Sequence, residues 1–183
     1  FRYTVLEGNT SSDLDYTSTS ALTLNGGTIN GPGNQPVTLT LPSPGGTGSL
    51  AGIGDDEKNF IVDGVKPTMT ITASQISNGG SFTGNLSLTF TSSESTTDLT
   101  ASDITVTGGT ITSFTGSGTS YQAIFTPDGD GSKSISIAGG AFTDAAGNSN
   151  TGSSSFTYTY DGTAPTITSA SSIDFLENGT GAV

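Results

Sequence analysis

The side chains of this sequence that could do chemistry are acidic residues placed in turns. Of its 16 acidic residues, 12 are Asp and 4 are Glu. The Asp residues stand beside Gly and Asn, in segments with the composition of turns, where short side chains can converge on one point. Calcium is bound by roughly six to eight oxygens from carboxylates, amides and backbone carbonyls. The excess of Asp in turns therefore favours a calcium-binding protein.

Two groups of candidate ligands follow if the strands run antiparallel in chain order. The first group would meet at the end of a module that faces the preceding linker, together with the turn after Phe90. The second would meet at the opposite end. The loop that starts at Asp128 is not an EF-hand, because its twelfth position is Gly139, where an EF-hand has a bidentate Glu. The alternative for both groups is a set of solvated, turn-capping residues. The candidates of the first group are Asp63, Asp98, Asp103, Asp144 and Asn148, and those of the second are Asp128, Asp130 and Asp161.

Catalysis is not expected. The chain has no His and no Cys, so a Ser-His-carboxylate triad and a thiolate nucleophile are excluded. Paired carboxylates such as Asp13 and Asp15 could in principle act as acid and base. They lie in Ser- or Gly-rich turns where water keeps both groups ionised, so neither would serve as a general acid. The sequence predicts a protein that is not an enzyme.

Charge and hydropathy narrow the possible partners. The formal net charge is −12, with only four basic residues, which argues against nucleic acid. The sequence contains no run of about 18 apolar residues, so no membrane insertion is expected within it. Phe1–Leu6 starts as a strand with no turn before it, and the segment Leu176–Gly179 near the end of the chain stops where another strand should follow. We therefore expect a piece of a longer protein.

The elements that must position these residues are strands. Apolar residues recur at every second position in six runs, which is the period of a strand with one face in a core. Gly-, Ser-, Asn- and Asp-rich turns separate the runs, and no helical period competes. The pattern predicts an all-β, antiparallel Ig-like sandwich. The alternating residues are Met69, Ile71, Ala73; Leu86, Leu88, Phe90; Ile104, Val106; Tyr121, Ala123, Phe125; Ile135, Ile137; and Phe156, Tyr158, Tyr160.

An internal repeat divides the chain into tandem modules. The segment DGVKPTMT at residues 63–70 returns as DGTAPTIT at residues 161–168. We predict the last strands of a truncated Ig-like module at 1–64, a complete module at 65–162, and the first strand of a cadherin-like or Ig-like module at 163–183. Pro67 and Pro165 restrict the residues before them to extended geometry, so each linker should be short and stiff.

Several stretches resemble a known family. DLTASDITVTGG at 98–109, GSGTSY at 116–121 and AFTDAAGN at 141–148 are similar to bacterial immunoglobulin-like (Big) domains of giant surface adhesins. Residues 11–29 resemble another repeat type of the same proteins, and residues 173–181 resemble the start of a cadherin-like repeat. The resemblance implies a secreted, cell-surface or biofilm-associated protein whose modules are stiffened by calcium, often at module junctions.

These observations predict an extracellular spacer that serves cell adhesion or biofilm attachment. Its partners would be neighbouring modules of the same chain. Two alternatives stay open. One is a structural subunit of a filament or sheath, in which copies of the chain complete one another by strand addition. The other is a sandwich that binds a glycan or a protein through its end loops.

Overall fold

The computed structural model describes residues 4–51 and 60–167. Within these ranges the regular elements are strands, apart from two short 3-10 turns, and the predicted all-β class is confirmed. No described helix is long and apolar enough to cross a membrane. The 3-10 turns are η1 (Pro32–Asn34) and η2 (Ala101–Asp103), and the strands are β1 (Thr10–Ser11), β2 (Val62–Asp63), β3 (Met69–Ala73), β4 (Ser81–Phe82), β5 (Leu86–Thr96), β6 (Ile104–Thr107), β7 (Gly109–Pro127), β8 (Gly131–Ile137) and β9 (Phe156–Tyr160).

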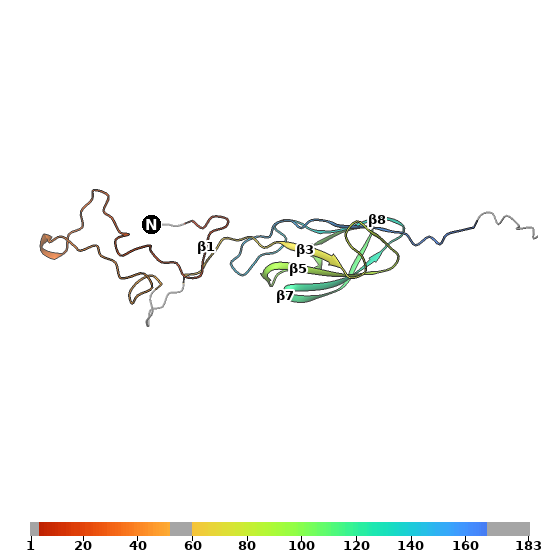
Figure 1. The fold of residues 1–183 in the computed structure, drawn as a ribbon, viewed down its shortest axis with the longest axis horizontal. Helices are drawn as coiled ribbons and strands as arrows, with labels where there is room; N and C mark the ends of the chain where they lie inside the picture. The colour runs from red at the N-terminus through yellow and green to blue at the C-terminus, as the bar shows by residue number, and fades with distance from the viewer. Residues whose placement is uncertain (1–3, 52–59, 168–183) are drawn as a thin grey trace, which may run out of the picture.

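Two sheets form a sandwich between residues 69 and 160 (Figure 1). One sheet has the order β3-β5-β7 and the other the order β4-β9-β8-β6. Neighbouring strands pair antiparallel, except that the two-residue strand β4 runs parallel to β9. The loop before β4 extends this pairing, because its backbone also bonds to β9: Gly79 N donates to Thr157 O, and Thr159 N donates to Gly80 O.

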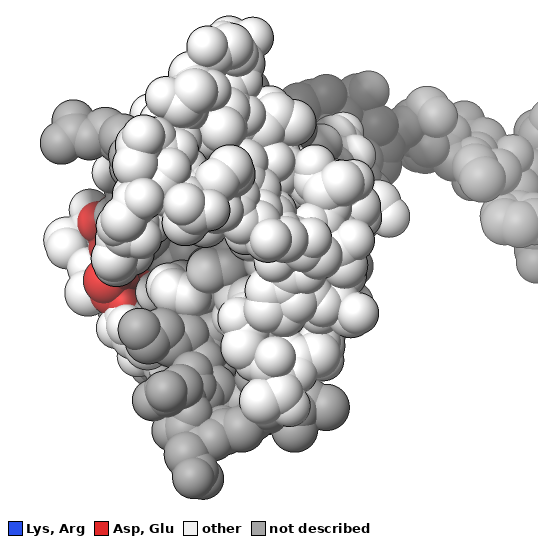
Figure 2. All heavy atoms as spheres, turned by 90° about the vertical axis from the view of Figure 1, so that its left-hand side faces the viewer, with Lys and Arg blue, Asp and Glu red and all other residues white. Residues whose placement is uncertain are grey.

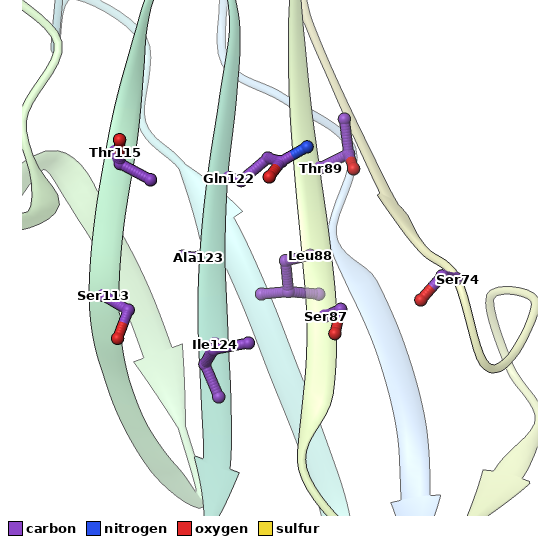
Figure 3. A pocket seen from close by; sticks show the side chains of 9 residues that line it. All are labelled: Ser74, Ser87, Leu88, Thr89, Ser113, Thr115, Gln122, Ala123 and Ile124. Carbon is purple, nitrogen blue, oxygen red and sulfur yellow. The ribbon is translucent and has the colours of Figure 1, made fainter.

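Strand β7 folds back on itself. Gly116 and Gly118 have positive φ, and the segment that carries Ser113 and Thr115 returns beside the one that carries Gln122 and Ile124 (Figure 3). Across this hairpin the rings of Phe114 and Tyr121 stack with centroids 5.6 Å apart. The sheet therefore gains a further edge segment, made from residues 109–115.

The core lies between the sheets and is built from the alternating residues. Leu86, Leu88 and Phe90 on β5 and Ile135 on β8 are almost fully buried. Phe125 of one sheet meets Tyr158 of the other edge to face, with ring centroids 6.0 Å apart. Burying one such side chain contributes about 1.5–3 kcal/mol, so this interior accounts for the cohesion of the sandwich.

Residues 4–51, which precede the sandwich, have less regular secondary structure than the sandwich itself. Residues 4–51 contain the strand β1 and an isolated bridge between Asn30 and Pro36. Several of their apolar side chains are exposed, among them Leu6 at 65%. The predicted module boundaries, 1–64, 65–162 and 163–183, stay predictions. The predicted cadherin-like start at 173–181 lies outside the described residues.

Candidate metal centre

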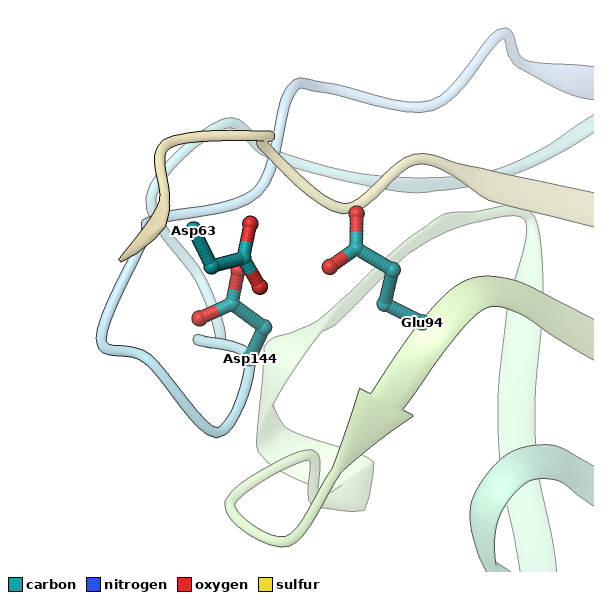
Figure 4. Close-up of side chains that lie close together, drawn as sticks. All are labelled: Asp63, Glu94 and Asp144. Carbon is teal, nitrogen blue, oxygen red and sulfur yellow. The ribbon is translucent and has the colours of Figure 1, made fainter. Parts of the chain in front are cut away.

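Three carboxylates from separate segments meet at the end of the sandwich that faces residues 4–51 (Figure 4). One oxygen each of Asp63, Glu94 and Asp144 lies within 4.8 Å of the other two. Asp63 ends β2, Glu94 lies near the end of β5, and Asp144 lies in the loop between β8 and β9. Asp144 is buried and the other two are half-buried. The group thus combines one carboxylate of the linker with two of the sandwich.

Asp63 is positioned by its own turn and by the segment before it. Its Oδ1 accepts a hydrogen bond from Val65 N at 3.0 Å, and β2 pairs antiparallel with β1, with Thr10 opposite Asp63. The next residue, Gly64, is closely packed, because a Cβ there would lie 2.3 Å from the backbone oxygen of Leu6. Only glycine permits this approach, which brings residues 5–10 against the linker.

Asp144 is held by its own loop. Its Oδ1 accepts from the backbone N–H of Ala146 at 2.9 Å and of Asn148 at 2.8 Å, and its Oδ2 accepts from Asn148 Nδ2 at 2.9 Å. The same Nδ2 donates to the backbone oxygen of Asp63 at 3.0 Å. Asn148 therefore ties the loop to the linker through its amide nitrogen.

The environment shifts the pKa values of Glu94 and Asp144 in opposite directions. Burial raises the pKa of Glu94, and the neighbouring charges of Asp63 and Asp144 raise it further. Burial also opposes ionisation of Asp144, but hydrogen bonds from the side chain and backbone of Asn148 and from nearby backbone N–H groups outweigh it and hold its pKa below the usual value. The group is thus a concentration of like charge that a bound cation would relieve.

The donor set fits calcium by its chemistry. Three carboxylates offer hard oxygens, and backbone carbonyls and water complete calcium shells in proteins. The residues that would hold the ion are Asp63, Glu94 and Asp144, and the ion would supply charge neutralisation and a cross-link between their segments.

The structure places Asp98 and Asp103 outside this group. Asp98 joins β5 to the 141–149 loop, because it accepts hydrogen bonds from the hydroxyl of Thr96 at 2.6 Å and from the backbone N–H and hydroxyl of Thr143 at 2.8–3.0 Å. Burial opposes its ionisation, but these bonds hold its pKa below the usual value. Asp103 caps η2, accepting from the backbone N–H and the hydroxyl of Thr100.

The candidates of the second group are spread over separate interactions. Asp128 pairs with Lys133, with Nζ 2.8 Å from Oδ1. Asp130 accepts hydrogen bonds from Gly162 N and from the Thr163 hydroxyl, and Asp161 accepts from Thr163 N at 3.2 Å. Among the described residues, the one acidic group close enough to share an ion is that of Asp63, Glu94 and Asp144.

Glu94 is not among the ligands that the sequence predicts, although the turn after Phe90 is predicted to lie at this end. The β5–β7 pairing shifts register between Thr91 and Thr96, so the outward or inward direction of Glu94 cannot be read from alternation. The pairing of β3 with β5, with Met69 opposite Ser92, brings this part of β5 beside the linker. A Glu within an otherwise Ser- and Thr-rich strand was the available signal.

Apart from the acidic group, a hollow lies on the outer face of the β3-β5-β7 sheet (Figure 3). Its volume is about 370 Å³, and six of its nine lining residues carry a hydroxyl or an amide. None of the nine lining residues is charged or aromatic, so this hollow offers neither a catalytic pair nor a stacking platform for a sugar. Its polar residues are Ser74, Ser87, Thr89, Ser113, Thr115 and Gln122.

Comparison with known proteins places the sandwich in a family. The family model described as a bacterial Ig-like domain matches residues 63–160. Searches of curated proteins and of solved structures gave no significant match. The matched span begins at Asp63 and ends at Tyr160, the last residue of β9.

Proposed function

The chain belongs to the bacterial Ig-like domain family, and from this premise we propose that it is a non-enzymatic, extracellular repeat segment of a large bacterial surface protein. In this proposal it acts as a calcium-stiffened spacer in cell adhesion or biofilm attachment. Domains of this family typically belong to extracellular or surface proteins, which supports the proposed location.

The path of the chain supports a spacer. Residues 4–51 lie at one end of the sandwich, and residues 161–167 leave from the opposite end (Figure 1). A chain that enters and leaves at opposite ends transmits tension along the length of the module. Such an arrangement sets a distance between two attachment points rather than enclosing a substrate.

The observation that carries the calcium proposal is the mixed origin of the acidic group. Asp63 belongs to the linker, whereas Glu94 and Asp144 belong to the sandwich. An ion held by all three would restrict rotation of the linker against the sandwich. It would also cancel the repulsion from Asp63 and Asp144, which adds to the effect of burial in raising the pKa of Glu94. Stiffening and stabilisation would then share one cause.

The test is thermal unfolding of the 183-residue chain in calcium and in a chelator. A ligand that binds only the native state at 100 times its Kd adds about 2.7 kcal/mol, so millimolar calcium over a site with a Kd of about 10 μM should raise Tm by roughly 10 °C or more. Asp63→Ala should keep the folded sandwich and lose most of this gain.

Magnesium at the same ionic strength is the control for general screening of the net charge of −12. If calcium and chelator gave the same Tm, or if magnesium matched calcium, the metal would have to be removed from the proposal.

A second candidate is a subunit of an extracellular filament or sheath. It is favoured by the exposed apolar residues outside the sandwich, such as Ile61 at 69% and Ile167 at 88%. Another copy of the chain could cover these side chains. The third possibility, glycan or protein binding through the end loops, is favoured by no specific observation.

A further inference from the structure

At each of the two Asp-Gly linkers, the backbone of the glycine forms a hydrogen bond with a turn that lies earlier in the chain. At the first linker Gly64 N donates to Asn9 O at 2.8 Å, and Gly8 N donates to Gly64 O at 2.8 Å. At the second linker Gly162 N donates to Asp130 Oδ1 at 2.7 Å. Both glycines therefore bond to a turn that lies immediately before a strand.

The strand pairs beside the two linkers correspond. Ser11 of β1 is opposite Val62 of β2, and Gly131 of β8 is opposite Tyr160 of β9. Val62 and Tyr160 occupy the same position relative to Asp63 and Asp161, the first residues of the two repeated segments. The β1–β2 pair thus has the same position relative to its linker as the end of the β8–β9 pair, although the glycine N–H donates to a backbone oxygen at the first turn and to a side-chain oxygen at the second.

The local geometry of the two linkers also agrees. Asp63 Oδ1 accepts from the N–H two residues later at 3.0 Å, and Asp161 Oδ1 does the same at 3.2 Å. A side-chain contact crosses from the turn to the linker in each case. At the first it is the ion pair of Lys66 Nζ with Glu7 Oε2 at 2.8 Å, and at the second the Thr163 hydroxyl donates to Asp130 Oδ2.

We propose that the turn before β1 (residues 7–9) and the turn before β8 (residues 128–130) each act as a clasp: each holds the first residues of the following module by hydrogen bonds, without a metal ion. Asp130 is the positioning residue of the clasp at the second linker. At the second linker the backbone N–H of Gly162 and the hydroxyl of Thr163 donate to the two carboxylate oxygens of Asp130. Hydrogen bonds to a carboxylate are short and about twice as strong as neutral ones. The clasp therefore orients the linker without an ion, so this inference goes beyond the calcium-dependent spacer.

The experiment is amide hydrogen exchange by NMR on the 15N-labelled 183-residue chain, in calcium and in chelator. In the wild type we expect Gly162 N–H to be equally protected in both conditions. Asp130→Ala should accelerate its exchange about tenfold or more, and Asp130→Asn, which keeps an acceptor oxygen, should fall between. Asp128→Asn is the matched control in the same turn and should leave Gly162 unchanged.

Protection of Ile135 and Ile137 in β8 reports whether each variant is folded. Thr163→Val provides a second test if Asp130→Ala disturbs the sandwich, because it removes only the linker's hydroxyl; we expect it to accelerate Gly162 exchange as well. Unchanged Gly162 exchange in a folded Asp130→Ala chain would overturn the clasp, as would loss of wild-type protection in chelator. Failure of the calcium proposal would show instead in Tm, with Gly162 protection intact.

Discussion

At the scale of single residues, Glu94 is a carboxylate whose ionisation opposes folding in the absence of a cation. Burial and the charges of Asp63 and Asp144 raise its folded-state pKa above the unfolded value. The protonated form is therefore favoured by folding, and its contribution to stability rises as pH falls through the raised pKa. Asp98 and Asp144 have lowered pKa values, so their contribution is present above the unfolded value and is lost as pH falls through the folded one.

Glu94→Gln should therefore stabilise the chain in chelator at pH 7. The expected gain is about 1 kcal/mol, the size of one like-charge repulsion across about 4 Å in well-screened surroundings. The gain should shrink at acidic pH, where Glu94 itself takes up a proton. The variant should also gain less stability from calcium than the wild type does. Urea unfolding at both pH values, with and without calcium, measures these differences.

Glu7→Gln is the control, because Glu7 is exposed and bonds to Lys66 outside the acidic group. It should bring no gain in chelator. A Glu94→Gln chain that is no more stable than the wild type in chelator at pH 7 would show that the three carboxylates do not repel one another appreciably.

At the scale of elements, β8 carries a lysine on its core-facing side. Lys133 shares a face with Ile135 and Ile137, and its side chain is only 3% exposed. Its stem covers Gly108, where a Cβ would lie 2.6 Å from Lys133 Cδ. Gly108 stands between β6 and β7, where the chain passes from one sheet to the other, and has a φ of +80°. The lysine stem and the glycine thus fill this crossing together, while Nζ reaches Asp128 at 2.8 Å.

Replacements of Lys133 should separate packing from charge. Lys133→Met keeps the stem and removes the ion pair, and its stability should stay within about 1 kcal/mol of the wild type, because Asp128 is 66% exposed and remains hydrated without its partner. Lys133→Ala leaves a cavity over Gly108 and should cost about 2–4 kcal/mol. Chemical denaturation of the three chains measures both effects. Equal losses in both variants would assign the role of Lys133 to its charge.

At the scale of the whole molecule, the net charge opposes association between copies of the chain, whereas the exposed apolar side chains favour it. The formal net charge of −12 keeps copies apart. In the view of Figure 2, acidic side chains show at one margin and the other described atoms are uncharged. The exposed apolar residues of the flanking segments would favour association if another chain covered them. Whether copies of the chain associate therefore distinguishes a spacer from a filament subunit.

The spacer proposal predicts a monomer. Sedimentation of the 18.2 kDa chain should give a single mass that does not change with protein concentration. The mass should also stay the same when the ionic strength is raised from about 0.01 M to about 0.15 M, where the Debye length falls to roughly 8 Å. Calcium should not change this mass, because the proposed ligands lie within one chain. Oligomers that grow with concentration would favour the filament or sheath.

The sequence by itself determined the longer strands of the sandwich and most residues of its core. Period-two alternation acts along the chain, so Leu88, Phe90 and Ile135 could be assigned to the interior without knowing their partners. The repeat marked Asp63 and Asp161 as equivalent in the same way. The module boundaries and the bound ion stay predictions.

Only the tertiary structure decided which acidic residues meet. Asp63 and Asp144, 81 positions apart, come together as expected, but Glu94 joins them, while Asp98 and Asp103 bond to the hydroxyls and N–H groups of nearby loops. Asp130 likewise reaches the next linker. The direction of such a side chain depends on strand register, on the shift in β5 and on the path of each loop. These are set by packing between distant segments, which local sequence pattern does not encode.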